Sequence, residues 1–110
     1  MDQYKGVLKL DILGVQRGFK FGTMQAAIFC KEMNVNLSGL TEILNDNNIE
    51  AQIVWYWSAA TSYARLFKVE EPTKDEVAAW IDTFGSDKLE AEAAAANIVP
   101  NEEAPINQGQ

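Results

Sequence analysis

The segment from Asn48 to Lys68 constrains the fold most, because it carries the densest aromatic cluster of the chain: Trp55, Tyr56, Trp57, Tyr63 and Phe67. Its apolar residues recur with the 3.6-residue period of a helix, whereas a period of two mixes polar and apolar side chains on both faces. We therefore predict a helix over Ile49–Phe67, with Asn48 as its N-cap. Buried aromatic side chains hide roughly 150–250 Å² each, so this helix is expected to supply most of the core.

The period divides this helix into three sets of residues. The face expected to be buried holds Ile49, Ile53, Tyr56, Trp57, Ala60, Tyr63, Ala64 and Phe67. The residues expected mostly outside it are Gln52, Ser58, Thr61, Ser62 and Arg65, and such polar interruptions argue against a membrane span. Trp55, Ala59 and Leu66 point away from the main face. Either a second layer of the same domain covers them, or they form an exposed apolar strip that binds a partner.

The N-terminal segment contains two β-like runs, Val7–Ile12 and Val15–Phe21, with Gly14 near the turn between them. In the first run, apolar residues alternate with Lys9 and Asp11, as in a half-buried strand. A hairpin is one reading and an extended arm is the other. Because an isolated two-stranded hairpin is marginal in water, it would have to pack on the helices or pair with another subunit.

Two shorter helices are predicted next. The first covers Met24–Met33 with Thr23 as N-cap, and Asn34 suits its end. The second covers Leu37–Leu44 with Ser38 as its cap. Its residues expected to face inward are Leu37, Leu40, Ile43 and Leu44.

Thr73 and Glu76 have the S/T-x-x-E spacing of a capping box, which predicts the start of a helix. This helix presents an apolar stripe and ends at Gly85. The stripe consists of Val77, Trp80, Ile81 and Phe84. Residues 86–96 are rich in Ala and Glu and predict a helix that is marginal alone, since Leu89 is its one large apolar residue.

The predicted fold is therefore mainly α, a small bundle of four to five helices with the N-terminal β-like segment. Residues 1–85 form the globular domain, residues 86–96 the marginal helix, and residues 97–110 a flexible acidic tail. A length of 110 residues and a hydrophobic fraction of 47% fit one globular domain.

Charge is distributed unevenly along the chain. The net charge is −7, with +1 on residues 1–69 and −8 on residues 70–110. Nucleic-acid binding needs a concentrated basic surface. The helices near residues 23–33 and 38–45 have the dimensions of a helix-turn-helix, but the second offers no basic residue and carries Glu42. We therefore expect no nucleic-acid partner.

The side chains offer little chemistry. The chain has no histidine, and its single cysteine, Cys30, stands among apolar residues as a small buried hydrophobe. The glycines at 14, 18 and 22 match neither the dinucleotide fingerprint nor the phosphate-binding loop. Asp75 and Glu76 are adjacent acids that suit a helix N-terminus better than catalysis. We predict a protein that is not an enzyme, binds no cofactor or metal, and stays in a reducing cytoplasm without a signal peptide.

Several stretches of the chain, read in order, resemble the tail assembly chaperones of long-tailed bacteriophages and prophages. They are Phe19–Met24, Cys30–Asn34, Leu37–Leu40, the aromatic helix with Ala59-Ala60 and Tyr63, Pro72-Thr73 and Val77–Asp82. The likeness spans roughly Val7 to Phe84.

The resemblance implies a small, mostly helical, non-enzymatic protein of the host cytoplasm that is absent from the mature virion. It implies two partners, the tape-measure protein and, through a frameshifted extension, the tail-tube protein. Trp55, Ala59 and Leu66 are the candidate partner-binding residues. The alternative is a small bacterial interaction adaptor or regulatory subunit unrelated to phage, and a homo-oligomer is open under either reading. A third class, a small enzyme, would need a deep polar pocket lined by Asp or Glu.

Overall fold

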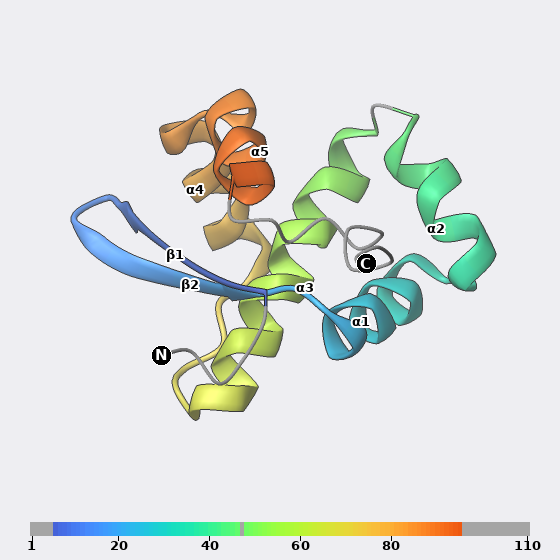
Figure 1. The fold of residues 1–110 in the computed structure, drawn as a ribbon, viewed down its shortest axis with the longest axis horizontal. Coiled ribbons are helices and arrows are strands. Elements are labelled where there is room, and N and C mark those ends of the chain that lie inside the picture. The colour runs from blue at the N-terminus through green and yellow to red at the C-terminus, as the bar shows by residue number, and fades with distance from the viewer. Residues whose placement is uncertain (1–5, 47, 96–110) are drawn as a thin grey trace, which may run out of the picture.

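A computed structural model describes residues 6–46 and 48–95 of the chain. Within these ranges lie two strands, β1 (Val7–Ile12) and β2 (Val15–Lys20), and five helices. The helices are α1 (Thr23–Met33), α2 (Leu37–Leu44), α3 (Ile49–Phe67), α4 (Lys74–Phe84) and α5 (Ser86–Ala95). Figure 1 shows α3 in the middle of the molecule, with α1 and α2 toward one side and the hairpin, α4 and α5 toward the other. The predicted mainly α fold with an N-terminal hairpin is confirmed.

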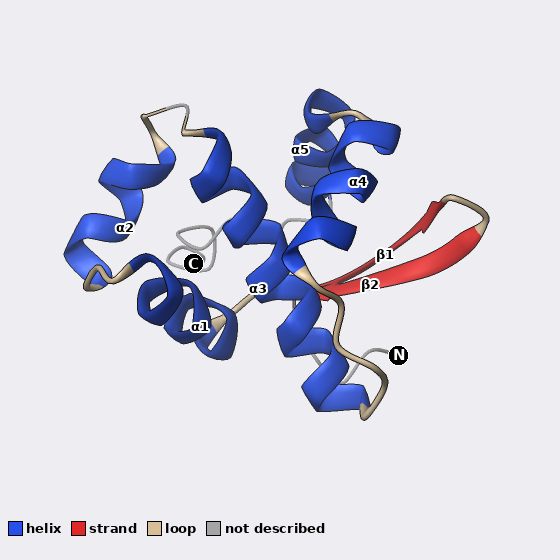
Figure 2. Cartoon of the chain, turned by 180° about the vertical axis from the view of Figure 1, so that it is seen from behind, coloured by secondary structure: helices blue, strands red, loops and turns tan. Residues whose placement is uncertain are grey.

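The two strands form an antiparallel hairpin, which Figure 2 shows from behind in red. Its register pairs Leu8 with Phe19 and Ile12 with Val15. The two turn residues, Leu13 and Gly14, both have positive φ, as the tight type I′ hairpin turn requires. The extended-arm reading is therefore wrong.

The hairpin is stabilised by helices of its own chain. Phe19 is 1% exposed, and its ring meets the rings of Tyr56 and Trp80 edge-on, at centroid distances of 6.2 and 6.1 Å. The Arg17 guanidinium lies over the Trp80 ring, 4.8 Å from its centroid. Packing against α3 and α4 supplies the apolar burial that two strands alone lack.

The ends of α1 and α2 differ in part from the sequence predictions. Thr23 is the first residue of α1 and no side chain caps that end, whereas Asn34 adopts the left-handed conformation predicted for the stop. The N-cap of α2 is Asn36, whose Oδ1 accepts from the Gly39 amide at 3.0 Å. Ser38, the predicted cap, instead donates its hydroxyl to the same oxygen at 2.8 Å. Leu37, the first residue of α2, is 72% exposed rather than inward-facing as predicted.

Helix α3 begins and ends where the sequence predicts, but its buried surface is wider than the predicted face. Asn48 caps it by accepting from the Ala51 amide at 3.1 Å. Its buried residues are Ala51, Val54, Tyr56, Ser58, Ala59, Ala60, Thr61, Ser62 and Ala64. The expectation that Ser58, Thr61 and Ser62 lie outside the core is therefore wrong, because neighbouring elements surround the helix.

Ser58 of α3 is buried where α1 packs on this helix. Gln25 of α1 is 2% exposed and donates to the Ser58 hydroxyl at 3.2 Å and to the Trp55 carbonyl at 3.3 Å. These bonds satisfy polar groups that would otherwise be costly to bury. The terminal residues Ile49 and Phe67, predicted to be buried, are 70% and 39% exposed because fewer elements reach the helix ends.

The core consists of two clusters joined by α3. The larger one combines the hairpin with α3, α4 and α5, and the smaller one combines α1 and α2 with the start of α3. Trp55 and Trp57 are half-buried and pack against both clusters. The single helix therefore couples the two halves of the core.

The capping box predicted for α4 is present. The Thr73 hydroxyl accepts from the Glu76 amide at 3.1 Å, and the Glu76 carboxylate accepts from the Thr73 amide at 2.8 Å. Gly85 ends α4, and α5 follows directly. Leu89 is completely buried in the larger cluster, so α5 belongs to the packed body. The predicted tail, residues 97–110, lies outside the described residues.

Gly18 of β2 gives the hairpin its closest approach to α3. A Cβ atom at this position would lie 2.3 Å from the Tyr63 ring. We predict that Gly18→Ala lowers the free energy of unfolding by about 1–3 kcal/mol, because the ring or the strand must move. Chemical denaturation measures this loss.

Gly39→Ala is the matched control. Its Cβ would meet neighbours at an ordinary 3.6 Å within a helix, so we expect a gain of about 0.5–1 kcal/mol. Equal stability of Gly18→Ala and the wild type would contradict the close packing of Tyr63 on the strand.

Candidate functional site: a groove between α3 and α5

The three residues predicted as an exposed strip do not form one. Each of the three residues has a different environment, and only Trp55 lines a groove.

 Ala59 is completely buried in the larger core cluster, because the hairpin and α4 cover that side of α3. Leu66 is half-buried near the C-terminal end of α3. Trp55 is half-buried, with its ring 5.5 Å from the Phe29 centroid and 6.1 Å from that of Phe21. The exposed-strip prediction is therefore wrong for Ala59, and the covering layer belongs to the same domain.

Trp55 lines a groove with a volume of about 640 Å³. We call it the α3–α5 groove, since α5 lies beside the N-terminal half of α3 (Figure 1). Its lining comprises Phe21, Leu44, Asn45, Asn48, Ile49, Gln52, Trp55, Tyr56, Ser86, Asp87, Glu90, Ala93 and Ala94. Its size is that of a typical ligand or peptide site.

The apolar side of the groove comes from the junction of β2, α2 and α3. Phe21 and Tyr56 meet edge-on, at a centroid distance of 6.1 Å, and Trp55 packs beside them. Leu44 contributes from the end of α2, and Ile49, 70% exposed, stands at the rim. An aliphatic side chain this exposed beside aromatic rings offers surface that a partner could cover.

The opposite wall is α5, which is small and acidic. The short side chains of Ala93 and Ala94 leave room between the helices. Asp87 and Glu90 are exposed and lie three residues apart, on one side of α5. Among the described residues that line the groove, these two carboxylates are the only charged side chains. Lys88 is directed to a different place, 4.9 Å from the centroid of the Phe84 ring.

Tyr56 places a polar group in this groove. The residue is 4% exposed, and its hydroxyl has no hydrogen-bond partner among the described residues. Burial, assisted by the negative charge of Glu90, raises the pKa of Tyr56 to about 12. The phenol therefore stays protonated at physiological pH and can donate to, or accept from, a bound molecule.

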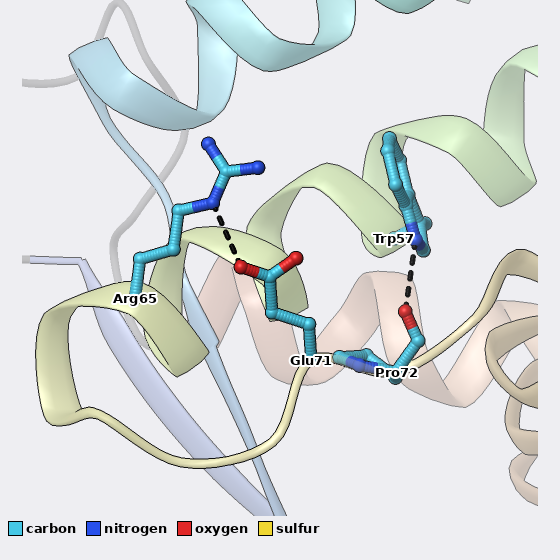
Figure 3. Close-up of polar contacts among 4 residues, drawn as sticks. All are labelled: Trp57, Arg65, Glu71 and Pro72. Carbon is cyan, nitrogen blue, oxygen red and sulfur yellow. Dashed lines mark hydrogen bonds and ion pairs between the residues drawn. The ribbon is translucent and has the colours of Figure 1, made fainter.

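A second, smaller groove of about 290 Å³ lies between β2, α3 and the loop before α4. Figure 3 shows how this loop is fastened to α3: Arg65 pairs with Glu71 at 3.0 Å, and the Trp57 indole donates to the Pro72 carbonyl at 3.1 Å. This groove has less than half the volume of the α3–α5 groove, so it is the weaker candidate site.

Other kinds of site find little support in the described part of the chain. No group of three or more metal-ligating side chains occurs among these residues. No helix within the described ranges is long and apolar enough to cross a membrane. Cys30 is half-buried against the smaller cluster rather than fully enclosed.

Comparisons of the chain with protein-family models, with curated proteins and with solved structures give no match. The resemblance to phage tail assembly chaperones therefore stays a prediction, and the function is argued from the groove.

Most of the groove could not be found from the sequence. Ile49 is predicted to face the core, and the sequence alone does not distinguish Asp87 and Glu90 from the other acids of residues 70–110. One signal of the groove is present in the sequence: Trp55 and Tyr56 are adjacent, so a single face of a helix cannot bury both rings.

The raised pKa of Tyr56 predicts a pH dependence of stability. In the unfolded chain the phenol ionises near its ordinary value of 10.0, whereas in the folded chain it ionises near 12. The contribution of the neutral phenol is therefore complete below pH 10 and is lost as the pH rises toward 12. Across this window the wild type should lose about 2–3 kcal/mol more unfolding free energy than Tyr56→Phe.

Chemical denaturation of both proteins at several alkaline pH values measures this difference. Comparing the two removes the contribution of the other tyrosines and of the lysines. Parallel losses in the two proteins would show that Tyr56 is not shielded from water.

Proposed function

We propose that this chain is a non-enzymatic tail assembly chaperone of a long-tailed phage or prophage, and that it holds a helical segment of the tape-measure protein in the α3–α5 groove. The observation that carries this proposal is the groove itself. It joins an exposed aliphatic rim, Ile49, to an aromatic side built from Phe21, Trp55 and Tyr56.

The physical argument concerns what an assembly chaperone must cover. A long tape-measure protein exposes apolar helical surface before the tail tube encloses it, and such surface aggregates in water. A groove between two helices accepts the apolar face of a third helix, whose backbone bonds are already satisfied internally. The net charge of −7 keeps the resulting complex soluble.

The sequence resemblance supports the same proposal. It implied a small, mostly helical protein, and five helices with a short hairpin agree with that expectation. Under this proposal the protein acts in the host cytoplasm and is left out of the finished virion. A tail-tube protein would be a second partner.

Co-expression with a tape-measure protein tests the proposal. The gene expected beside this one encodes a tape-measure protein, and we predict that the chain keeps it soluble and co-purifies with it. Ile49→Asp should weaken the complex at least about tenfold, because covering a large aliphatic side chain contributes roughly 1.5–3 kcal/mol and burying a carboxylate adds a penalty. Isothermal titration of the purified pair measures the loss.

The substitution should leave the fold intact, since Ile49 is exposed and is the first residue of α3, where an acid is favourable. The matched control is Leu37→Asp, which changes a 72% exposed aliphatic residue outside the groove lining and should bind like the wild type. Equal binding by Ile49→Asp, or neighbouring genes unrelated to tails, would instead favour the adaptor of another pathway.

A further inference from the structure

We infer that the α3–α5 groove selects a positively charged amphipathic helix, one whose apolar stripe is flanked by Lys or Arg. This inference rests on the proposed function and names the chemistry of the partner segment. It follows from three features of the groove that are independent of the sequence resemblance.

The first feature is the absence of any strand edge in the groove. None of its described lining residues belongs to β1 or β2, so an extended peptide would find no row of backbone groups to pair with. A helix needs no such row. The wall formed by α5, Ser86–Ala95, is about 15 Å long, enough for nearly three turns of a helix packed beside it.

The second feature is the sign of the charge. Asp87 and Glu90 stand one helical turn apart on the wall, and no Lys or Arg lies among the described lining residues to neutralise them. A bound helix that carries cations at positions three or four residues apart would place them opposite these carboxylates. An acidic helix in the same place would meet two like charges, and a nucleic acid would be repelled for the same reason.

The third feature is the hydroxyl of Tyr56. The residue is 4% exposed and lines the groove beside Glu90, and its hydroxyl makes no hydrogen bond to another described residue. A Lys ammonium or an Arg guanidinium that reached past Glu90 would donate to this oxygen, which a purely apolar ligand could not do.

Two synthetic peptides of about 15 residues test the inference. Both carry Leu at helical spacing, and the positions that flank this stripe are Lys in one peptide and Glu in the other. Fluorescence anisotropy of the labelled peptides with the full chain measures both affinities. We expect the lysine peptide to bind at least about fivefold tighter at low salt, because each exposed ion pair contributes modestly. The preference should shrink at about 0.5 M salt, where charges are strongly screened.

Variants assign the preference to the wall. Asp87→Asn combined with Glu90→Gln should abolish most of the preference for the lysine peptide. The matched control, Asp11→Asn combined with Asp82→Asn, makes the same change in net charge on exposed residues outside the groove lining. It should preserve the preference. Tyr56→Phe should weaken the lysine peptide about threefold through the lost hydrogen bond.

The outcomes separate the two proposals. Equal binding of the two peptides overturns the charge selection and leaves the groove as a helix-binding site. Binding of neither peptide overturns both the selection and the site. A preference for lysine that survives in the Asp87 and Glu90 double variant places the cation elsewhere and contradicts the inference.

Discussion

The structure depends on the burial of α3 along most of its circumference. Its aromatic residues pack against the hairpin and α4, while its Ser and Thr side chains lie against other elements, with Gln25 of α1 bonded to Ser58 at 3.2 Å. A single helix thus supplies apolar surface to both core clusters. Removing the cover from either side would expose part of the same helix, so we expect the two clusters to unfold together.

The candidate site lies where this coverage ends. At the N-terminal half of α3, the end of α2 and the small helix α5 leave the α3–α5 groove between them. The residues of α3 at this end therefore serve two purposes, since Tyr56 belongs to the core cluster and also lines the groove. Under the proposed function, a partner that fills the groove would cover the apolar surface that the chain itself leaves exposed.

Part of the negative charge of the chain lies at the α3–α5 groove. From the sequence, the uneven charge, −8 on residues 70–110, argues only against a nucleic-acid partner. In the structure, two of these acids, Asp87 and Glu90, form the wall of the groove, held in place by the complete burial of Leu89 between them in sequence. Because Leu89 anchors α5, part of the negative charge of the chain is concentrated at the groove.

The sequence predicted the elements better than their surroundings. The bounds of α3, the capping box of Thr73 and Glu76, and the hairpin were all predictable because each depends on local spacing. The burial of Ser58 and Thr61 was not, since it requires knowing that α1 and its neighbours enclose the polar side of α3 as well. The predicted cap of α2 failed for a local reason: Asn36 competes with Ser38 for the same helix end, and spacing alone does not choose between them.

The most direct test of the groove is a nuclear magnetic resonance titration of the ¹⁵N-labelled chain with the lysine-flanked helical peptide. The three tryptophan side chains report on three places: Trp55 in the groove, Trp57 bonded to the Pro72 carbonyl, and Trp80 in the core beside the hairpin. Our account predicts that the Trp55 indole signal and the backbone amides of Ile49 and Glu90 shift with peptide, while the Trp57 and Trp80 indole signals stay in place. Shifts centred on Trp57 or Trp80, with Trp55 unchanged, would contradict it.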